Sequence, residues 1–88
     1  MLTVRESNAF KRDIKRLRRG NFDISKLGEI TLKLSKNEKL DVRYSDHALI
    51  GNWKGYRECH ITPDWLLIYI ITDDELLLAR TGSHSELF

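Results

Sequence analysis

The spacing of apolar residues gives the N-terminal half of the chain a helical pattern. Phe10, Ile14 and Leu17 recur at intervals of four and three residues, which predicts a helix over residues 8–19. Gly20 is expected to end it, because glycine is the residue most often found just past a helix C-terminus. The basic residues of this segment all miss the apolar stripe and would form a wide cationic surface.

A second helix is predicted from the next set of apolar positions. Leu27, Ile30 and Leu34 would point inward, and Asp23 or Ser25 can cap the N-terminus. The connection between the two helices is short, which indicates a helical hairpin.

The C-terminal half changes to a period of two, which is typical of strands. Trp53–Ile61 alternates between two faces, and Thr62–Asp64 reads as a turn in which proline pre-sets the backbone. Trp65–Thr72 is apolar on both faces, which predicts a central strand covered on both sides, and Glu75–Thr81 follows as another strand. A short N-terminal strand is predicted at Met1–Arg5.

Together these elements predict one α+β domain spanning residues 1–88. Its expected order is an N-terminal strand, a two-helix hairpin and three antiparallel strands (β-α-α-β-β-β), with the helices packed on one face of the sheet. The other face would stay partly open, and binding groups are often placed at strand ends and loops of such a scaffold.

Composition restricts the class of protein further. The chain is 41% hydrophobic and 32% charged, which is ordinary for a globular domain. Its longest apolar run, residues 65–71, is too short to span a membrane, and the N-terminus does not resemble a signal peptide. The single cysteine cannot form an internal disulfide, so we expect a cytoplasmic protein with no membrane partner.

Charge is distributed unevenly along the chain. Residues 1–20 contain seven Lys or Arg against two Asp or Glu, whereas residues 45–88 contain three against seven. The first helix could therefore contact a polyanion or an acidic partner, or could simply be a solvated helix.

Candidate chemistry lies in the strand-rich half. His47, His60 and His84 are all the histidines of the chain, and Asp64 lies in a predicted turn. Histidine suits both the acid and the base role in proton transfer, since its ordinary pKa of about 6.5 keeps both forms populated near neutrality. A protein can cut RNA with such groups alone, because the 2′-OH of the substrate is the nucleophile.

Other residues could bind the substrate of such a reaction. Arg57 and Arg80 could hold a phosphate with paired hydrogen bonds, and Trp65, Tyr56 or Phe88 could stack a base.

Each of these candidates also has a structural alternative. A single histidine near a turn is usually a surface residue, Arg80 could pair with Glu58 or Asp64, and Trp65 could belong to the core. A metal site that includes both Cys59 and His60 is not expected, because neighbouring strand residues point to opposite faces. For the same reason we do not expect Cys59 to act as a nucleophile beside His60.

Two segments carry a resemblance to a known family. DHALIGNWKGYRECHITPDWLLIY, residues 46–69, and RTGSHSELF, residues 80–88, closely resemble the YafQ-like branch of the RelE/ParE superfamily of bacterial toxins. The resemblance implies a toxin of a type II toxin–antitoxin system. It further implies a ribosome-dependent endoribonuclease without metal or cofactor, which leaves a 2′,3′-cyclic phosphate and a 5′-OH.

The resemblance also implies which residues act. The expected catalytic positions are His47, His60, Asp64, His84 and Phe88. Arg80 is the phosphate-binding candidate, joined by Arg57 and Trp65 from the reasoning above. Glu58 stands two residues before the central histidine, where the family pattern leads us to expect aspartate, so its reach is longer.

The implied partners are a cognate antitoxin, the ribosome and mRNA, and we expect the free toxin to be a monomer. The predicted ribosome-binding residues lie on the first helix: Lys11, Arg12, Lys15, Arg16 and Arg19. Three alternatives stay open, namely a ParE-like toxin that inhibits gyrase, a non-catalytic RNA-binding module and a metal-dependent hydrolase.

Overall fold

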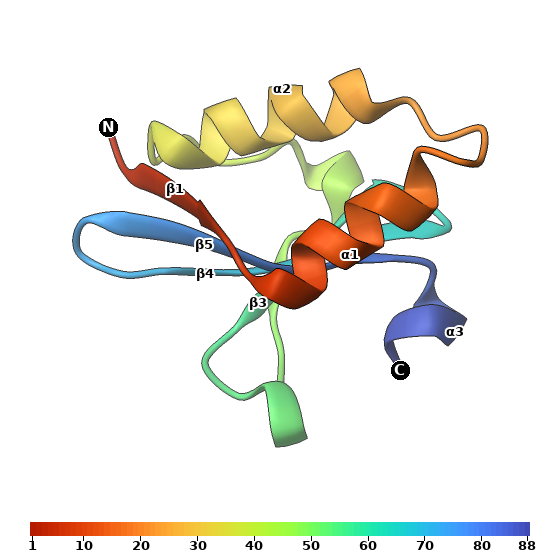
Figure 1. Ribbon diagram of the computed structural model, residues 1–88. Helices are drawn as coiled ribbons and strands as arrows, with labels where there is room; N and C mark the ends of the chain where they lie inside the picture. The colour runs from red at the N-terminus through yellow and green to blue at the C-terminus, as the bar shows by residue number, and fades with distance from the viewer.

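The computed structural model describes all 88 residues, which form a five-stranded sheet with helices on both faces (Figure 1). The strand order is β1-β5-β4-β3-β2, with β1 parallel to β5 and the other neighbours antiparallel. The elements are β1 (Thr3–Glu6), α1 (Asn8–Leu17), α2 (Ile24–Ser35), η1 (Val42–Tyr44), β2 (His47–Ala48), η2 (Gly51–Trp53), β3 (Arg57–Thr62), β4 (Trp65–Ile71), β5 (Glu75–Gly82) and α3 (His84–Leu87). The predicted α+β class and element order are confirmed.

Both predicted long helices form, with caps that their sequences explain. The Ser7 side chain accepts a hydrogen bond from the Phe10 amide at the start of α1, and Asp23 caps α2 by accepting from the Ser25 amide. α1 ends at Leu17, three residues before Gly20, so the prediction placed its end slightly late.

The strand predicted from Trp53 begins later than expected. Residues 51–53 form the short helix η2, and β3 starts only at Arg57. Gly51 and Gly55 take positive φ angles of 69° and 96°, which glycine adopts readily and other residues rarely do. These two glycines turn the chain, so the apparent alternation before Arg57 does not correspond to a strand.

Three further short elements were not predicted. Val42–Tyr44 form η1, His47 and Ala48 form the edge strand β2, and residues 84–87 form α3. Elements of two to four residues are too short for a hydrophobic period to reveal them.

Two apolar clusters lie on opposite faces of the sheet. The larger joins α1 and α2 to one face and includes Phe10, Leu34 and Leu67. The smaller has four buried residues, in which Leu87 of α3 packs near Leu66. β4 is therefore covered on both sides, as predicted, but the α3 face has the thinner cover.

Figure 1 shows the same arrangement, with α1 and α2 on one side of the sheet and α3 near the C-terminus on the other. None of the helices is long and apolar enough to cross a membrane.

Candidate active site

The carboxylate of Glu58 lies between two imidazole rings. One of its oxygens, Oε1, is 3.2 Å from Nε2 of His60 and 3.5 Å from Nε2 of His47. The two rings have centroids 6.2 Å apart, and both histidine side chains are partly exposed, whereas the Glu58 side chain is only 5% exposed. Glu58, which has a longer reach than the aspartate expected at this position, therefore connects the two rings.

Strand pairing brings these groups together. His47 is the register partner of Glu58 across β2 and β3, and His60 follows Glu58 by two residues on the same strand face. The Nδ1 atom of His47 is 2.6 Å from the backbone oxygen of Ser45, which fixes the ring orientation. His47 and His60 thus lie close together beside Glu58.

The same sheet face receives α3. Leu66 of β4 pairs with His60 on one side and with Gly82 on the other, so these three residues form a row across the sheet. Two residues after Gly82 the chain enters α3, whose Leu87 belongs to the apolar cluster with Leu66. The start of α3 is therefore two strands away from His60, on the His60 face.

The short helix α3 presents the last two predicted catalytic residues. Ser83 and Glu86 form a capping box at its N-terminus. The His84 and Phe88 rings are 5.0 Å apart, and Phe88 is 53% exposed. Phe88 therefore does not fill the core and its ring is free to contact a ligand.

Asp64 lies in the two-residue turn between Thr62 and Trp65. It is exposed to solvent. Since the turn directly follows the β3 segment that contains His60, Asp64 lies at the same end of the sheet as that histidine.

Arg80 has a different partner from either alternative that the sequence suggested. Its Nε and Nη2 atoms donate to the two oxygens of Asp13, at 2.7 and 3.1 Å, and it contacts neither Glu58 nor Asp64. The pKa of Arg80 is raised, first by this hydrogen bond to Asp13. Arg80 is therefore bound to α1 through two of its five N–H donors, and a phosphate could be bound only by the donors of Nη1 and the second N–H of Nη2.

Asp13 is the buried acid that sequence reasoning missed. It is 2% exposed and also accepts hydrogen bonds from the Thr81 amide and from Arg16. Burial by itself raises the pKa of its carboxyl. The hydrogen bonds from Arg80, Thr81 and Arg16 outweigh burial, so the pKa lies below its ordinary value. The sequence did contain a signal for this buried acid, because Asp13 falls within the apolar stripe of the helix, between Phe10 and Leu17.

Arg16 was predicted to face the ribosome, but the structure places it in internal contacts. Besides Asp13 it binds Glu86 of α3, with Nε 2.8 Å from a carboxylate oxygen. A β-carbon on Gly82 would lie 2.9 Å from Nη2 of Arg16 and from Oε1 of Glu86, so a side chain at this position would displace the ends of the pair. Arg16 therefore ties α3 to α1.

The structure corrects the prediction that Trp65 binds substrate, and it places Arg57 away from the Glu58 carboxylate. Trp65 is 2% exposed, packs edge-on against Phe22 and donates from its indole to Thr81, so it cannot stack a base. Arg57 points to the face opposite Glu58 and donates to the Asp46 carboxylate at 3.2 Å.

The thiol of Cys59 is fully buried, and burial raises its pKa to about 12. It therefore stays protonated at neutral pH and is not a nucleophile, as predicted. No group of three His, Cys, Asp or Glu side chains is arranged to hold a metal ion.

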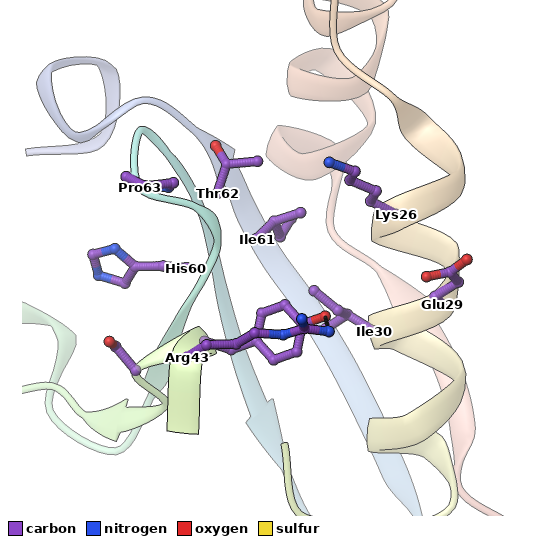
Figure 2. Close-up of a pocket in the computed structure, with 10 residues that line it drawn as sticks. Lys26, Glu29, Ile30, Arg43, His60, Ile61, Thr62 and Pro63 are labelled. Atoms are coloured by element: carbon purple, nitrogen blue, oxygen red, sulfur yellow. Dashed lines mark hydrogen bonds between the residues drawn. The ribbon is translucent and has the colours of Figure 1, made fainter. Parts of the chain in front are cut away.

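A groove of about 710 Å³ lies beside His60, between α2, η1 and β3. Figure 2 shows His60 projecting from β3 on the side away from α2, while Lys26 of α2 lies across the strand. The groove therefore adjoins the histidine cluster at the edge of the sheet.

Comparison with known proteins assigns the family. The family model of the YafQ bacterial toxin of type II toxin–antitoxin systems matches residues 2–88. The chain belongs to the YafQ toxin family. The mRNA interferase toxin YafQ of Escherichia coli K12 is 41% identical over 86 residues, which cover 97% of this chain and 94% of the relative.

Solved structures of relatives agree with the YafQ assignment. A copper-bound variant of a Helicobacter pylori toxin has a TM-score of 0.96 and 51% identity, with complete coverage of both chains. YafQ from the E. coli DinJ–YafQ complex has a TM-score of 0.92 and 39% identity, covering 100% of this chain and 99% of that one. The predicted resemblance is thus confirmed for the family and the fold.

Proposed function

We propose that this chain is the toxin of a type II toxin–antitoxin pair and an endoribonuclease that cuts mRNA on the ribosome. The family match over residues 2–88 and the name mRNA interferase of the E. coli relative support the proposal. The observation that carries it in this chain is the pair of imidazoles around one buried carboxylate, with α3 on the same sheet face. The proposed unit is one toxin domain, residues 1–88, acting in the cytoplasm where ribosomes translate.

The proposed reaction needs no nucleophile from the protein. The 2′-OH attacks the adjacent phosphorus while a base takes its proton, which forms the P–O2′ bond. The P–O5′ bond breaks, and an acid protonates the departing oxygen. The products are a 2′,3′-cyclic phosphate and a 5′-OH, and no atom has to come from a cofactor.

The site residues suggest a division of roles. His84 and His60 are proposed for proton transfer, with Asp64 as an alternative acid or as an orienting group. His47 would hold the phosphate or a flanking nucleotide. Glu58 would orient the His47 and His60 rings through its 3.5 and 3.2 Å contacts.

Phe88 and Arg80 complete the proposed site. The exposed ring of Phe88, 5.0 Å from that of His84, would position the base. Arg80 would donate to the phosphate from Nη1, while Asp13 holds its guanidinium through Nε and Nη2.

The proposal includes a protein partner. The E. coli relative has been solved in complex with the antitoxin DinJ, and we propose a cognate antitoxin for this chain. An acidic segment of such a partner would suit the exposed basic residues Lys11, Arg12 and Lys15 of α1, together with Arg19 in the turn that follows it.

Primer extension on a translated message tests the function. The wild-type toxin should give discrete 5′-OH ends within the reading frame, and His84→Ala should reduce them at least about 100-fold, the usual contribution of a general acid or base. Circular dichroism should stay unchanged, since His84 is exposed. Gyrase-dependent DNA damage without message cleavage would instead support the ParE-like alternative.

A further inference from the structure

The groove beside His60, here called the edge groove, is built on an unpaired part of β3. β2 pairs with β3 only at Glu58 and Arg57, and no backbone hydrogen bond from η1 reaches the strand beyond them. The Leu49 amide donates to the Tyr56 carbonyl, so by alternation the amide and carbonyl of His60 also point toward this open edge. His60 thus presents its ring to the sheet face and its backbone to the groove.

A flat cationic platform forms one wall of the edge groove. The guanidinium carbon of Arg43 lies 4.9 Å from the centroid of the Tyr44 ring, and Arg43 also donates to the Tyr44 hydroxyl at 3.0 Å. Arg43 forms no ion pair, in contrast to the paired Arg57 and Arg80. An exposed guanidinium supported by an aromatic ring is a surface on which a nucleobase can stack.

The opposite wall adds a second cation over an apolar floor. Lys26 of α2 lines the groove and forms no ion pair, while Ile30 and Ile61 lie between the walls. Glu29 is the one carboxylate among the lining residues, so the lining favours an anion with an apolar or aromatic part. A volume of about 710 Å³ is within the range of small-molecule sites and is large enough for a nucleotide.

We propose that the edge groove is a nucleotide subsite that holds the residue next to the scissile bond of single-stranded RNA. The base would stack on the Arg43–Tyr44 platform, Lys26 would contact a phosphate, and the backbone groups of His60 would contact the base edge. This inference rests on the proposed ribonuclease function. The RNA strand would pass over the β3 edge, so that one nucleotide lies in the groove while the next phosphate meets the His60 ring.

Single-stranded RNA fits these features better than an acidic peptide does. A peptide could use the cations and the strand edge, but it has no need of a planar cationic stacking surface.

The test measures cleavage kinetics on ribosomes programmed with three synthetic messages. One is unmodified, and the others carry an abasic ribose on the 5′ or the 3′ side of the cut. The variants are Arg43→Ala, Arg43→Lys, Lys26→Ala and, as a matched control on the exposed surface of α2, Lys33→Ala. Thermal unfolding of each variant checks the fold.

On the unmodified message, Arg43→Ala should raise KM about tenfold with kcat within about twofold, as expected for a lost stacking contact. Arg43→Lys should raise KM less than Arg43→Ala does, because lysine keeps the positive charge but lacks the planar guanidinium. Lys26→Ala should raise KM about three- to tenfold, and Lys33→Ala should leave it unchanged. On one abasic message the effect of Arg43→Ala should fall below about twofold.

Other results would overturn the inference. If the wild type cuts the message but Arg43→Ala and Lys33→Ala have equal KM values, the groove is not a subsite and the nuclease function stands. The inference also fails if Arg43→Ala raises KM about tenfold on both abasic messages. It fails as well if Arg43→Ala and Lys26→Ala weaken antitoxin binding but leave cleavage unchanged. No cleavage by the wild type would refute the proposed function and the subsite together.

Discussion

The Glu58 carboxylate lies within 3.2 Å of one imidazole and 3.5 Å of another, yet its side chain is 5% exposed. A buried carboxylate is costly unless it is paired or hydrogen-bonded, and the only partners of its side chain are His47 and His60. Its position between the rings therefore restricts both of them to one orientation, which proton transfer to or from a bound substrate requires.

Replacement of this carboxylate by an amide tests its role. We expect Glu58→Gln to lower kcat of message cleavage about 10- to 100-fold, equivalent to losing a hydrogen bond to a charged group. The shape of the side chain is kept, so the fold should persist. Single-turnover cleavage gives the rate, and Glu38→Gln in an exposed segment is the control. A wild-type rate for Glu58→Gln would remove Glu58 from the site.

At the residue scale, the sequence revealed the types of side chain better than their partners. The three histidines were recognised because their spacing matches a family and because imidazole suits proton transfer. The structural alternative for Arg80 was an ion pair with Glu58 or Asp64, but its partner is Asp13, 67 residues away. No local pattern encodes such a pair, since it depends on how α1 packs on the sheet.

At the element scale, α1 completes the edge of β5. β1 pairs with β5 only from Glu75 to Leu78, which leaves the end of β5 without a strand partner. Asp13 of α1 accepts the Thr81 amide at 3.1 Å and binds Arg80 beside it, so a side chain takes the place of a strand. This contact holds the end of β5, and α3 begins directly after it.

Loss of this carboxylate should destabilise the protein in a pH-dependent way. We expect Asp13→Asn to lower the free energy of unfolding at pH 7 by about 3 kcal/mol, because it breaks a buried pair. The pKa of Asp13 is lowered in the folded state, so the unfolded chain binds the proton more tightly. The stabilisation is therefore complete above the ordinary pKa of 3.8 and is lost as pH falls through the folded pKa.

Urea unfolding between pH 7 and pH 2.5 measures this effect. The difference between wild type and Asp13→Asn should be largest at neutral pH and should shrink below about pH 4. Asp73→Asn, in an exposed turn, should follow the wild type at every pH. A difference that stays constant with pH would mean that the charge of Asp13 does not stabilise the fold.

At the scale of the whole molecule, charge is separated along the sequence and in space. Excess Lys and Arg lie on the exposed face of α1, whereas the acidic second half forms most of the sheet. Arg16 does not belong to the free cationic surface, since it binds Asp13 and Glu86. Phosphate contacts through the remaining basic residues would give affinity for ribosomal RNA without reading its sequence.

Charge reversal on α1 tests this surface. We expect the combined variant Lys11→Glu, Arg12→Glu and Lys15→Glu to weaken ribosome association at least about tenfold. It should also reduce the salt dependence of binding by about one unit of slope per lost phosphate contact. Lys33→Glu with Lys36→Glu and Lys39→Glu, at and beyond the end of α2, is the matched control with the same change in charge. If both variants bind the ribosome equally well over a salt series, the basic residues of α1 do not contact the ribosome and are only exposed to solvent.

The main architecture was predictable because long elements bury regular faces. α2 carries Leu27, Ile30 and Leu34 inward as expected, and β4 is apolar on both sides because both sheet faces are covered. The parallel pairing of β1 with β5 and the position of α3 were not predictable. They depend on contacts between the two ends of the chain, such as the Ser7 amide with the Leu78 carbonyl.

The central claim is that the histidine site lets the 2′-OH of the message attack its own phosphate. The most direct measurement compares two programmed ribosomes that differ by one atom, a 2′-OH or a 2′-H at the nucleotide before the cut. The account predicts cleavage of the first message with a 2′,3′-cyclic phosphate end, and no cleavage of the second. Cleavage of the 2′-deoxy message at the same bond and rate would contradict it.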